Sequence, residues 1–242
     1  MKSSGIMTVT AGLLAAALWV APAEGQLMFE AAGKAGAGTI EVGIAGGMST
    51  VEYDVDDLGD NEIERSAVAV NAAYGLTPMI DLCGALAYLV DVEPEGWHDS
   101  GDGLAIAGGL RACVMERDPL AVYAYGQILY LTEDFGEGWI EDGGFAVRVD
   151  GENTLMELTI GALCTYPLMD AVTVYAGAEV VAMSEGEVEL DAGAMSADYD
   201  HERNDVLGVK LGARYDLQSY WLRAELGLIN EETILLGAGM VF

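Results

Sequence analysis

The sequence has few basic residues and, beyond residue 23, no long hydrophobic run. Ten Lys and Arg residues oppose 40 Asp and Glu residues, giving a net charge of −30. Such acidity argues against nucleic acid as a partner, because its phosphates would be repelled. No run of ~18 apolar residues follows residue 23, which excludes a membrane-spanning helix. Because 52% of the chain is nevertheless hydrophobic, the apolar residues must be distributed over many short elements.

The N-terminus has the pattern of a secretory signal. Lys2 precedes an apolar stretch from Ile6 to Val20, and small residues at Ala21 and Ala23 occupy the two positions that a signal peptidase recognises. A membrane-anchoring helix is the weaker alternative, because the most apolar part, Ala11 to Val20, is too short to span about 30 Å of hydrocarbon and Pro22 ends it. We predict three parts, namely a signal peptide over 1–23, a flexible periplasmic lead-in over 24–38 and a single domain over 39–242.

Apolar residues in this domain alternate with a period of two, as in β-strands. Near the C-terminus, Tyr220, Leu222 and Leu226 share one face of a segment, whereas Arg223 and Glu225 share the other. One face of each such segment is large and apolar, and the opposite face is Gly, Ala or charged. Glycines and alanines would make a poor water-facing surface, whereas inside a narrow barrel they leave room for long polar side chains. The pattern therefore predicts an all-β fold, a single transmembrane antiparallel up-and-down β-barrel with its apolar face toward lipid.

The connections between these segments alternate between short turns and long loops. Short turns on one rim and long loops on the other are typical of bacterial outer-membrane barrels. The segmentation gives ten strands, with eight as the alternative. The predicted strands are 39–48, 66–76, 80–90, 104–114, 120–132, 154–166, 172–182, 206–216, 219–229 and 233–242, and the predicted long loops are 49–65, 91–103, 133–153 and 183–205.

The chain ends on an apolar strand with an aromatic last residue. The terminal sequence LLGAGMVF resembles the C-terminal insertion signal of Gram-negative outer-membrane barrels, with Gly237, Met240 and Phe242 at the expected spacing. Together with the signal peptide and the ten alternating strands, it makes 39–242 similar to the small outer-membrane barrels of the OmpA and OmpX type. The resemblance implies an integral, monomeric outer-membrane protein that contacts lipid and lipopolysaccharide and is recognised by the barrel-insertion machinery.

The alternation directs seven charged side chains into the predicted lumen. Buried charges need partners, and we expect a cross-strand network between Lys210 and Arg214 on one strand and Arg223 and Glu225 on the next. We therefore predict a structural or surface-interaction role with a largely filled lumen, and keep a narrow cation-preferring, porin-like channel as the alternative. The seven residues are Glu41, Arg111, Glu179, Lys210, Arg214, Arg223 and Glu225.

The predicted long loops are acidic and carry both histidines. Their negative field attracts cations, so loosely bound divalent cations that bridge to lipopolysaccharide phosphates are candidate partners. His98 and His201 lie beside carboxylates, in GWHDSGD and ADYDHERND, and some outer-membrane hydrolases and acyltransferases use such a dyad. Because a carboxylate neighbour is expected by chance in so acidic a chain, we predict no enzyme and keep loop-borne hydrolysis as a distant alternative.

Three cysteines remain. Cys83 and Cys113 lie on the inner face of adjacent predicted strands, almost symmetrically about residue 98, so they are candidates for a disulfide, which is permitted outside the cytoplasm. Cys164 is an isolated apolar residue. No CxxC spacing is present, so we predict no metal and no cofactor.

Overall fold

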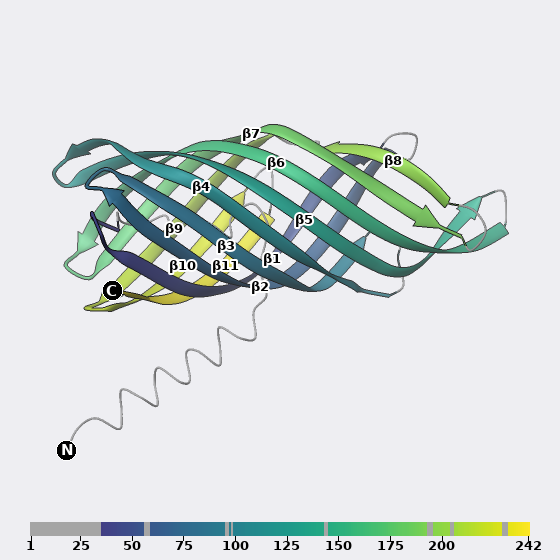
Figure 1. Ribbon diagram of the computed structural model, residues 1–242, viewed down its shortest axis with the longest axis horizontal. Coiled ribbons are helices and arrows are strands. Elements are labelled where there is room, and N and C mark those ends of the chain that lie inside the picture. Colours follow the sequence, from purple (N-terminus) through teal and green to yellow (C-terminus); the bar gives the residue numbers. More distant parts are fainter. Residues whose placement is uncertain are drawn as a thin grey trace, which may run out of the picture.

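The computed structural model describes residues 35–55, 59–94, 97, 99–142, 145–192, 196–203, 206–228 and 232–242. They form one closed antiparallel β-sheet (Figure 1). Its strands are β1 (Ile40–Val55), β2 (Gly59–Thr77), β3 (Ile80–Pro94), β4 (Gly101–Arg117), β5 (Leu120–Asp142), β6 (Phe145–Met169), β7 (Val172–Asp191), β8 (Ser196–Arg203), β9 (Leu207–Leu217), β10 (Tyr220–Leu228) and β11 (Glu232–Val241). Within the described residues, no helix is long and apolar enough to cross a membrane.

The barrel closes where the last strand meets the first. Met240 of β11 lies opposite Val42 of β1, and Gly237 lies on the same seam. Beyond the end of β11, the N–H of Phe242 donates to the C=O of Ile40 at 2.8 Å, and the N–H of Ile40 donates back to the C=O of Phe242 at 3.2 Å. A barrel closes only when its last strand pairs with its first, and this seam provides that pairing.

Large apolar side chains face outward around the barrel. Next to the short turns lies a ring of exposed aromatic residues, namely Tyr74, Tyr166, Tyr215, Tyr220 and Phe242, and Tyr88 and Tyr130 lie at the opposite edge of the apolar band. An apolar band between two aromatic girdles is the exterior of a membrane-spanning barrel. Exposed aliphatic members of the band include Ile40, Val42, Met48, Val70, Leu82, Leu86, Leu104, Ile106, Leu110, Ile128, Ile160, Val180, Leu211, Leu226 and Ile234.

The predicted long loops are wrong in large part, because most of their residues continue the strands. β1 and β2 stay paired as far as Val55 and Gly59, and β5 and β6 as far as Asp142 and Phe145. The barrel therefore extends well beyond the apolar band, at the end opposite the C-terminus (Figure 1). In this outer half the exterior is acidic rather than apolar, so the apolar-outward pattern disappears while the strands continue.

One predicted loop contains an additional strand, β8, which changes the number of strands along the barrel. It pairs with β7, where His201 lies opposite Gly186, and with β1, where Arg203 lies opposite Tyr53. The short strands β9, β10 and β11 complete a ten-stranded barrel in the apolar half, and β8 takes their place in an eight-stranded outer half. The prediction of ten membrane-spanning strands is confirmed, and the alternative of eight describes only the outer half.

Candidate functional site

The charged side chains buried inside the barrel balance one another. Among the described residues, six carboxylates and six basic groups are buried, none more than 7% exposed. They include six of the ten basic residues of the whole chain, so the large negative excess lies elsewhere. The carboxylates are Glu41, Asp81, Glu133, Glu157, Glu179 and Glu225, and the basic residues are Arg65, Arg111, Arg203, Lys210, Arg214 and Arg223.

A first cluster lies in the apolar half and is centred on Lys210. Its Nζ lies 2.7 Å from Oε2 of Glu179, a carboxylate that also accepts a hydrogen bond from the Tyr125 hydroxyl. The hydroxyl of Tyr175 donates to Oε2 of Glu225 at 2.6 Å, and Glu225 is close enough to Lys210 to interact electrostatically. These contacts connect β5, β7, β9 and β10 through the interior.

Three further ion pairs lie in the same half. Nη1 of Arg214 lies 3.1 Å from Oε2 of Glu41, which joins β9 to β1, and Nε of Arg214 lies 2.8 Å from Oδ1 of Asp216. Arg111 donates to Oδ2 of Asp81 through Nη2 at 2.8 Å and through Nε at 3.1 Å. Charge-assisted hydrogen bonds of this kind are the strong ones in a low-dielectric interior.

All seven residues expected in the lumen are buried inside the barrel, but several partners differ from the expectation. The register places Arg214 opposite Arg223, which are like charges, and Glu225 opposite Gly212. The ion pairs of Lys210 and Arg214 instead reach β7 and β1. Which charges meet inside a barrel depends on the stagger of its strands, and the alternation of side chains along one strand does not contain that information.

A second cluster lies in the outer half, and the sequence analysis missed it. Arg65 contacts Glu133 in a bidentate arrangement, at 2.5 and 2.6 Å, and its Nη1 donates to the Tyr53 hydroxyl at 3.1 Å. The side-chain amide of Asn153 donates to Glu133 at 2.8 Å, and its Oδ1 lies 2.7 Å from Nε2 of His201. All five residues lie in the predicted long loops, for which the sequence pattern predicts no inward face.

The outer cluster contains a second ion pair and a neutral histidine. Arg203 donates to both carboxylate oxygens of Glu157, at 2.9 and 3.1 Å. Burial, together with the nearby Arg65 guanidinium, lowers the pKa of His201 to about 4. At neutral pH the ring is therefore uncharged.

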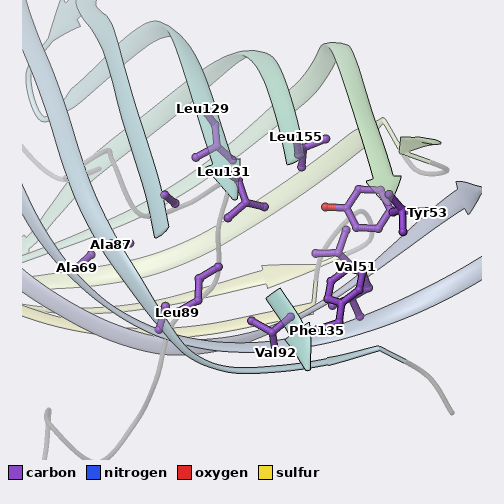
Figure 2. Close-up of a cluster of buried hydrophobic side chains, with 14 of the residues drawn as sticks. Val51, Tyr53, Ala69, Ala87, Leu89, Val92, Leu129, Leu131, Phe135 and Leu155 are labelled. Atoms are coloured by element: carbon purple, nitrogen blue, oxygen red, sulfur yellow. The ribbon is translucent and has the colours of Figure 1, made fainter. Parts of the chain in front are cut away.

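Buried apolar side chains form a cluster in the outer half that includes Tyr53 (Figure 2). In this half the large residues point inward, as in a water-soluble protein, and Leu129, Leu131 and Leu155 are almost completely buried. The outer half therefore has a hydrophobic core of its own. Its members are Val51, Tyr53, Ile63, Ala67, Ala69, Ala87, Leu89, Val92, Ala105, Leu129, Leu131, Phe135, Leu155, Val188 and Leu190.

Several glycines on the inner face provide space for the rings of these clusters. A Cβ at Gly161 would lie 2.3 Å from the Tyr125 ring, and one at Gly212 would lie 2.2 Å from the Tyr175 ring. Each ring thus lies against the backbone of a neighbouring strand. The inner glycines were predicted to leave room for long side chains, and at Gly161 and Gly212 the side chain that uses this room is a tyrosine ring of the neighbouring strand.

The histidine dyads of the distant hydrolase alternative are not formed among the described residues. His201 points into the barrel, whereas Asp198 and Asp200 of the same strand are exposed on its other face. Its ring contacts Asn153 and Tyr53 instead. His98 lies outside the described residues.

The two cysteines that were candidates for a disulfide do not face each other. Cys83 lies opposite Gly109 on β4, whereas Cys113 lies closer to the short turn, where its N–H donates to the C=O of Met79. Both side chains are buried and form no disulfide, and Cys164 is half-buried. The register pairs β3 with β4 about residue 96 rather than residue 98, since Cys83 lies opposite Gly109.

The exterior of the outer half carries a row of carboxylates at directly opposite positions on five neighbouring strands. We call it the acidic ladder. Each member lies across from the next, and all are exposed. No group of acidic, histidine or cysteine residues able to hold a metal ion occurs within the described part of the chain. The ladder consists of Asp102, Asp134, Glu152, Glu189 and Asp198.

No protein-family model matches the chain, and no curated protein matches it. Solved structures share its fold. The outer membrane protease OmpT from Escherichia coli is 11% identical with a TM-score of 0.53, over 84% of this chain and 96% of that one. The translocator domain of the autotransporter NalP from Neisseria meningitidis is 11% identical with a TM-score of 0.51, over 98% of this chain and 96% of that one.

These likenesses concern the fold alone. Together with the apolar exterior, they confirm the predicted fold, a transmembrane antiparallel β-barrel of the kind found in outer-membrane proteins. One of the two is a protease and the other a translocator domain, so this fold by itself does not decide whether the chain catalyses a reaction.

Proposed function

We propose that this protein is an outer-membrane barrel whose lumen is closed by its own charged side chains and whose role is structural or surface-interaction. The supporting observation is the balanced set of twelve buried charges, arranged in a cluster in each half of the barrel. A permeation path needs groups along its length that can replace the water around a solute. Paired, desolvated side chains at two levels oppose such a path.

In this proposal the outer half is the part that meets other molecules. Its hydrophobic core makes it a rigid extension that holds the acidic ladder outside the membrane. A field of one sign attracts cations and basic surfaces and repels anions. Loosely bound divalent cations, bridging to lipopolysaccharide phosphates, belong to the same proposal.

The biogenesis of the chain is also part of the proposal. Residues 1–23 act as the signal peptide and 24–38 as the periplasmic lead-in, of which only 35–38 lie within the described residues. Gly237, Met240 and Phe242 form the signal that the insertion machinery recognises. The barrel works as a monomer in contact with lipid and lipopolysaccharide.

Single-channel recording of the refolded chain in a planar bilayer tests the closed lumen. We expect no discrete conductance from a protein whose slow, heat-modifiable gel migration shows that the barrel has folded. Glu225→Ala removes a buried carboxylate, and Glu187→Ala, on the exposed face of β7, is the matched control. Discrete steps from the unmodified chain, altered by the first substitution and not by the second, would contradict the proposal.

A narrow cation-preferring channel is the alternative function. The observation in its favour is the inner face of β4, which carries only small residues along part of the lumen. Neighbouring side chains lie against part of this strip, as Leu89 does at Gly103, so a path along it would be narrow. A lumen with equal numbers of buried positive and negative charges gives little preference for ions of either sign. Conductance steps that favour cations over anions would therefore identify this alternative. The residues are Gly101, Gly103, Ala105, Ala107 and Gly109.

A further inference from the structure

The β5–β6 hairpin extends beyond the other strands of the described chain (Figure 1). Pairing between β4 and β5 ends at Asp134, whereas β5 and β6 remain paired as far as Asp142 and Phe145. An exposed ion pair between Arg148 and Glu137 links the two strands in this extension. The extension is therefore a two-stranded ribbon that projects from the outer end of the barrel.

One edge of this ribbon has a vacant position beside it. β7 accompanies β6 only up to Asp150, which lies opposite Asp191, the last residue of β7. The chain then reverses, because Asp191 also lies opposite Ser196 of β8. The position that β7 would occupy beside 145–149 of β6 thus holds no strand among the described residues.

The sequence of this edge suits the addition of a strand. Residues 145–149 read FAVRV, which contains strong β-formers and no proline, glycine or acidic residue. Sheet edges in natural proteins are usually protected by charges, proline or bulges. The single charged residue here, Arg148, is engaged by Glu137 on β5. Backbone N–H and C=O groups along the edge are therefore available to a further chain.

The charge around the edge specifies the kind of chain. At the inner end of the edge, Asp150 of β6 lies opposite Asp191 of β7. The acidic ladder crosses the same two strands, so a strand added beside 145–149 would lie close to carboxylates. A second copy of this protein carries the same net charge of −30 and would be repelled. A segment with Lys or Arg residues is favoured both electrostatically and by its encounter rate.

We propose that 145–149 of β6 binds an extended basic peptide segment of another protein by strand addition. Main-chain hydrogen bonds provide the affinity in this mode, and the flanking carboxylates provide the preference for basic partners. The inference rests on the proposed surface-interaction role and specifies its mode and partner class. It is independent of whether the lumen conducts.

Fluorescence anisotropy of the refolded full chain in detergent micelles tests the proposal. The probe is a labelled peptide of nine residues in which Lys, Val and Thr alternate with no acidic residue. The matched peptide has the same sequence with N-methyl groups on alternate residues, which removes the N–H donors of one edge and keeps the charge. The matched protein has residues 137–148 replaced by Asn-Gly, which removes the ribbon and keeps every member of the acidic ladder.

We expect the unmodified peptide to bind, and both changes to weaken binding about tenfold or more, since at least two backbone hydrogen bonds are lost. Equal binding of the N-methylated peptide would overturn the proposal, because charge alone would then explain the affinity. Unchanged binding to the shortened protein would place the site elsewhere, and no binding of the unmodified peptide at roughly 1 mM would exclude the site. A dimer that forms without peptide and disappears in the shortened protein would show that a second copy is the occupant.

Discussion

Replacing Glu152 by glutamine should stabilise the barrel. Glu152 lies opposite Asp134 on β5 and opposite Glu189 on β7, and all three are exposed. Unit charges about 4 to 5 Å apart repel by about 1 kcal/mol in water, and directly opposite like charges destabilise a sheet. Because the side chains can splay apart, removal of two repulsions should raise the free energy of unfolding by about 1 kcal/mol rather than about 2.

The assay is urea unfolding of the chain refolded in lipid vesicles, followed by tryptophan fluorescence at about 20 mM and about 1 M NaCl, where the Debye length falls to ~3 Å. The stabilisation should shrink to a few tenths of a kcal/mol at the higher salt concentration. Glu185→Gln is the control, because Glu185 is exposed and lies opposite Met156. If Glu152→Gln stabilises no more than this control, or if salt leaves the difference unchanged, the electrostatic account of the ladder is wrong.

Three further predictions concern the interior. Lys210→Met leaves the buried Glu179 without its ion-pair partner and should cost about 3 to 5 kcal/mol in urea unfolding; adding Glu179→Leu should recover most of this, and no recovery would contradict the pairing. Gly161→Val should prevent heat-modifiable refolding, because its side chain would overlap a tyrosine ring, whereas Gly108→Ala, with nothing within 4 Å, should refold normally. The pKa of His201 is lowered to about 4 in the folded protein, so as the pH decreases the unfolded chain binds a proton before the folded chain does. The free energy of unfolding should therefore fall by about 3 kcal/mol as pH decreases from 6.5 to 4. His201→Gln should remove that part of the pH dependence, and an unchanged profile would show that other groups cause it.

The transmembrane half could be predicted from the sequence because lipid imposes a simple rule on it. Every second residue of a strand must be apolar, as with Leu222 and Leu226 on β10, and closure requires that the last strand pairs with the first. The same rule fails in the outer half. There Leu131 points inward while Asp134 points outward, so a search for apolar residues on the lipid face classifies a continuing strand as a loop.

In the candidate site, too, one part could be predicted from the sequence and another could not. The burial of Lys210 and Arg223 follows from their parity along strands with a clear lipid face. Their partners do not, because the contact between Arg214 and Glu41 depends on how far each strand is staggered around the closed barrel. The inward position of Glu133 was readable in principle, since it continues the inward series of Leu129 and Leu131, but only if β5 was allowed to continue past the apolar band.

The contact between Arg214 and Glu41 also has a consequence for assembly. Its partners lie 173 positions apart in the chain and belong to strands at opposite ends of the sequence, so neither can reach the other until the final strands have approached the first. Arg214 has Asp216 within reach on its own strand before that moment, whereas the charge of Glu41 then depends on water. We therefore expect the pairing of the first and last strands to be coupled to the loss of water from this part of the interior.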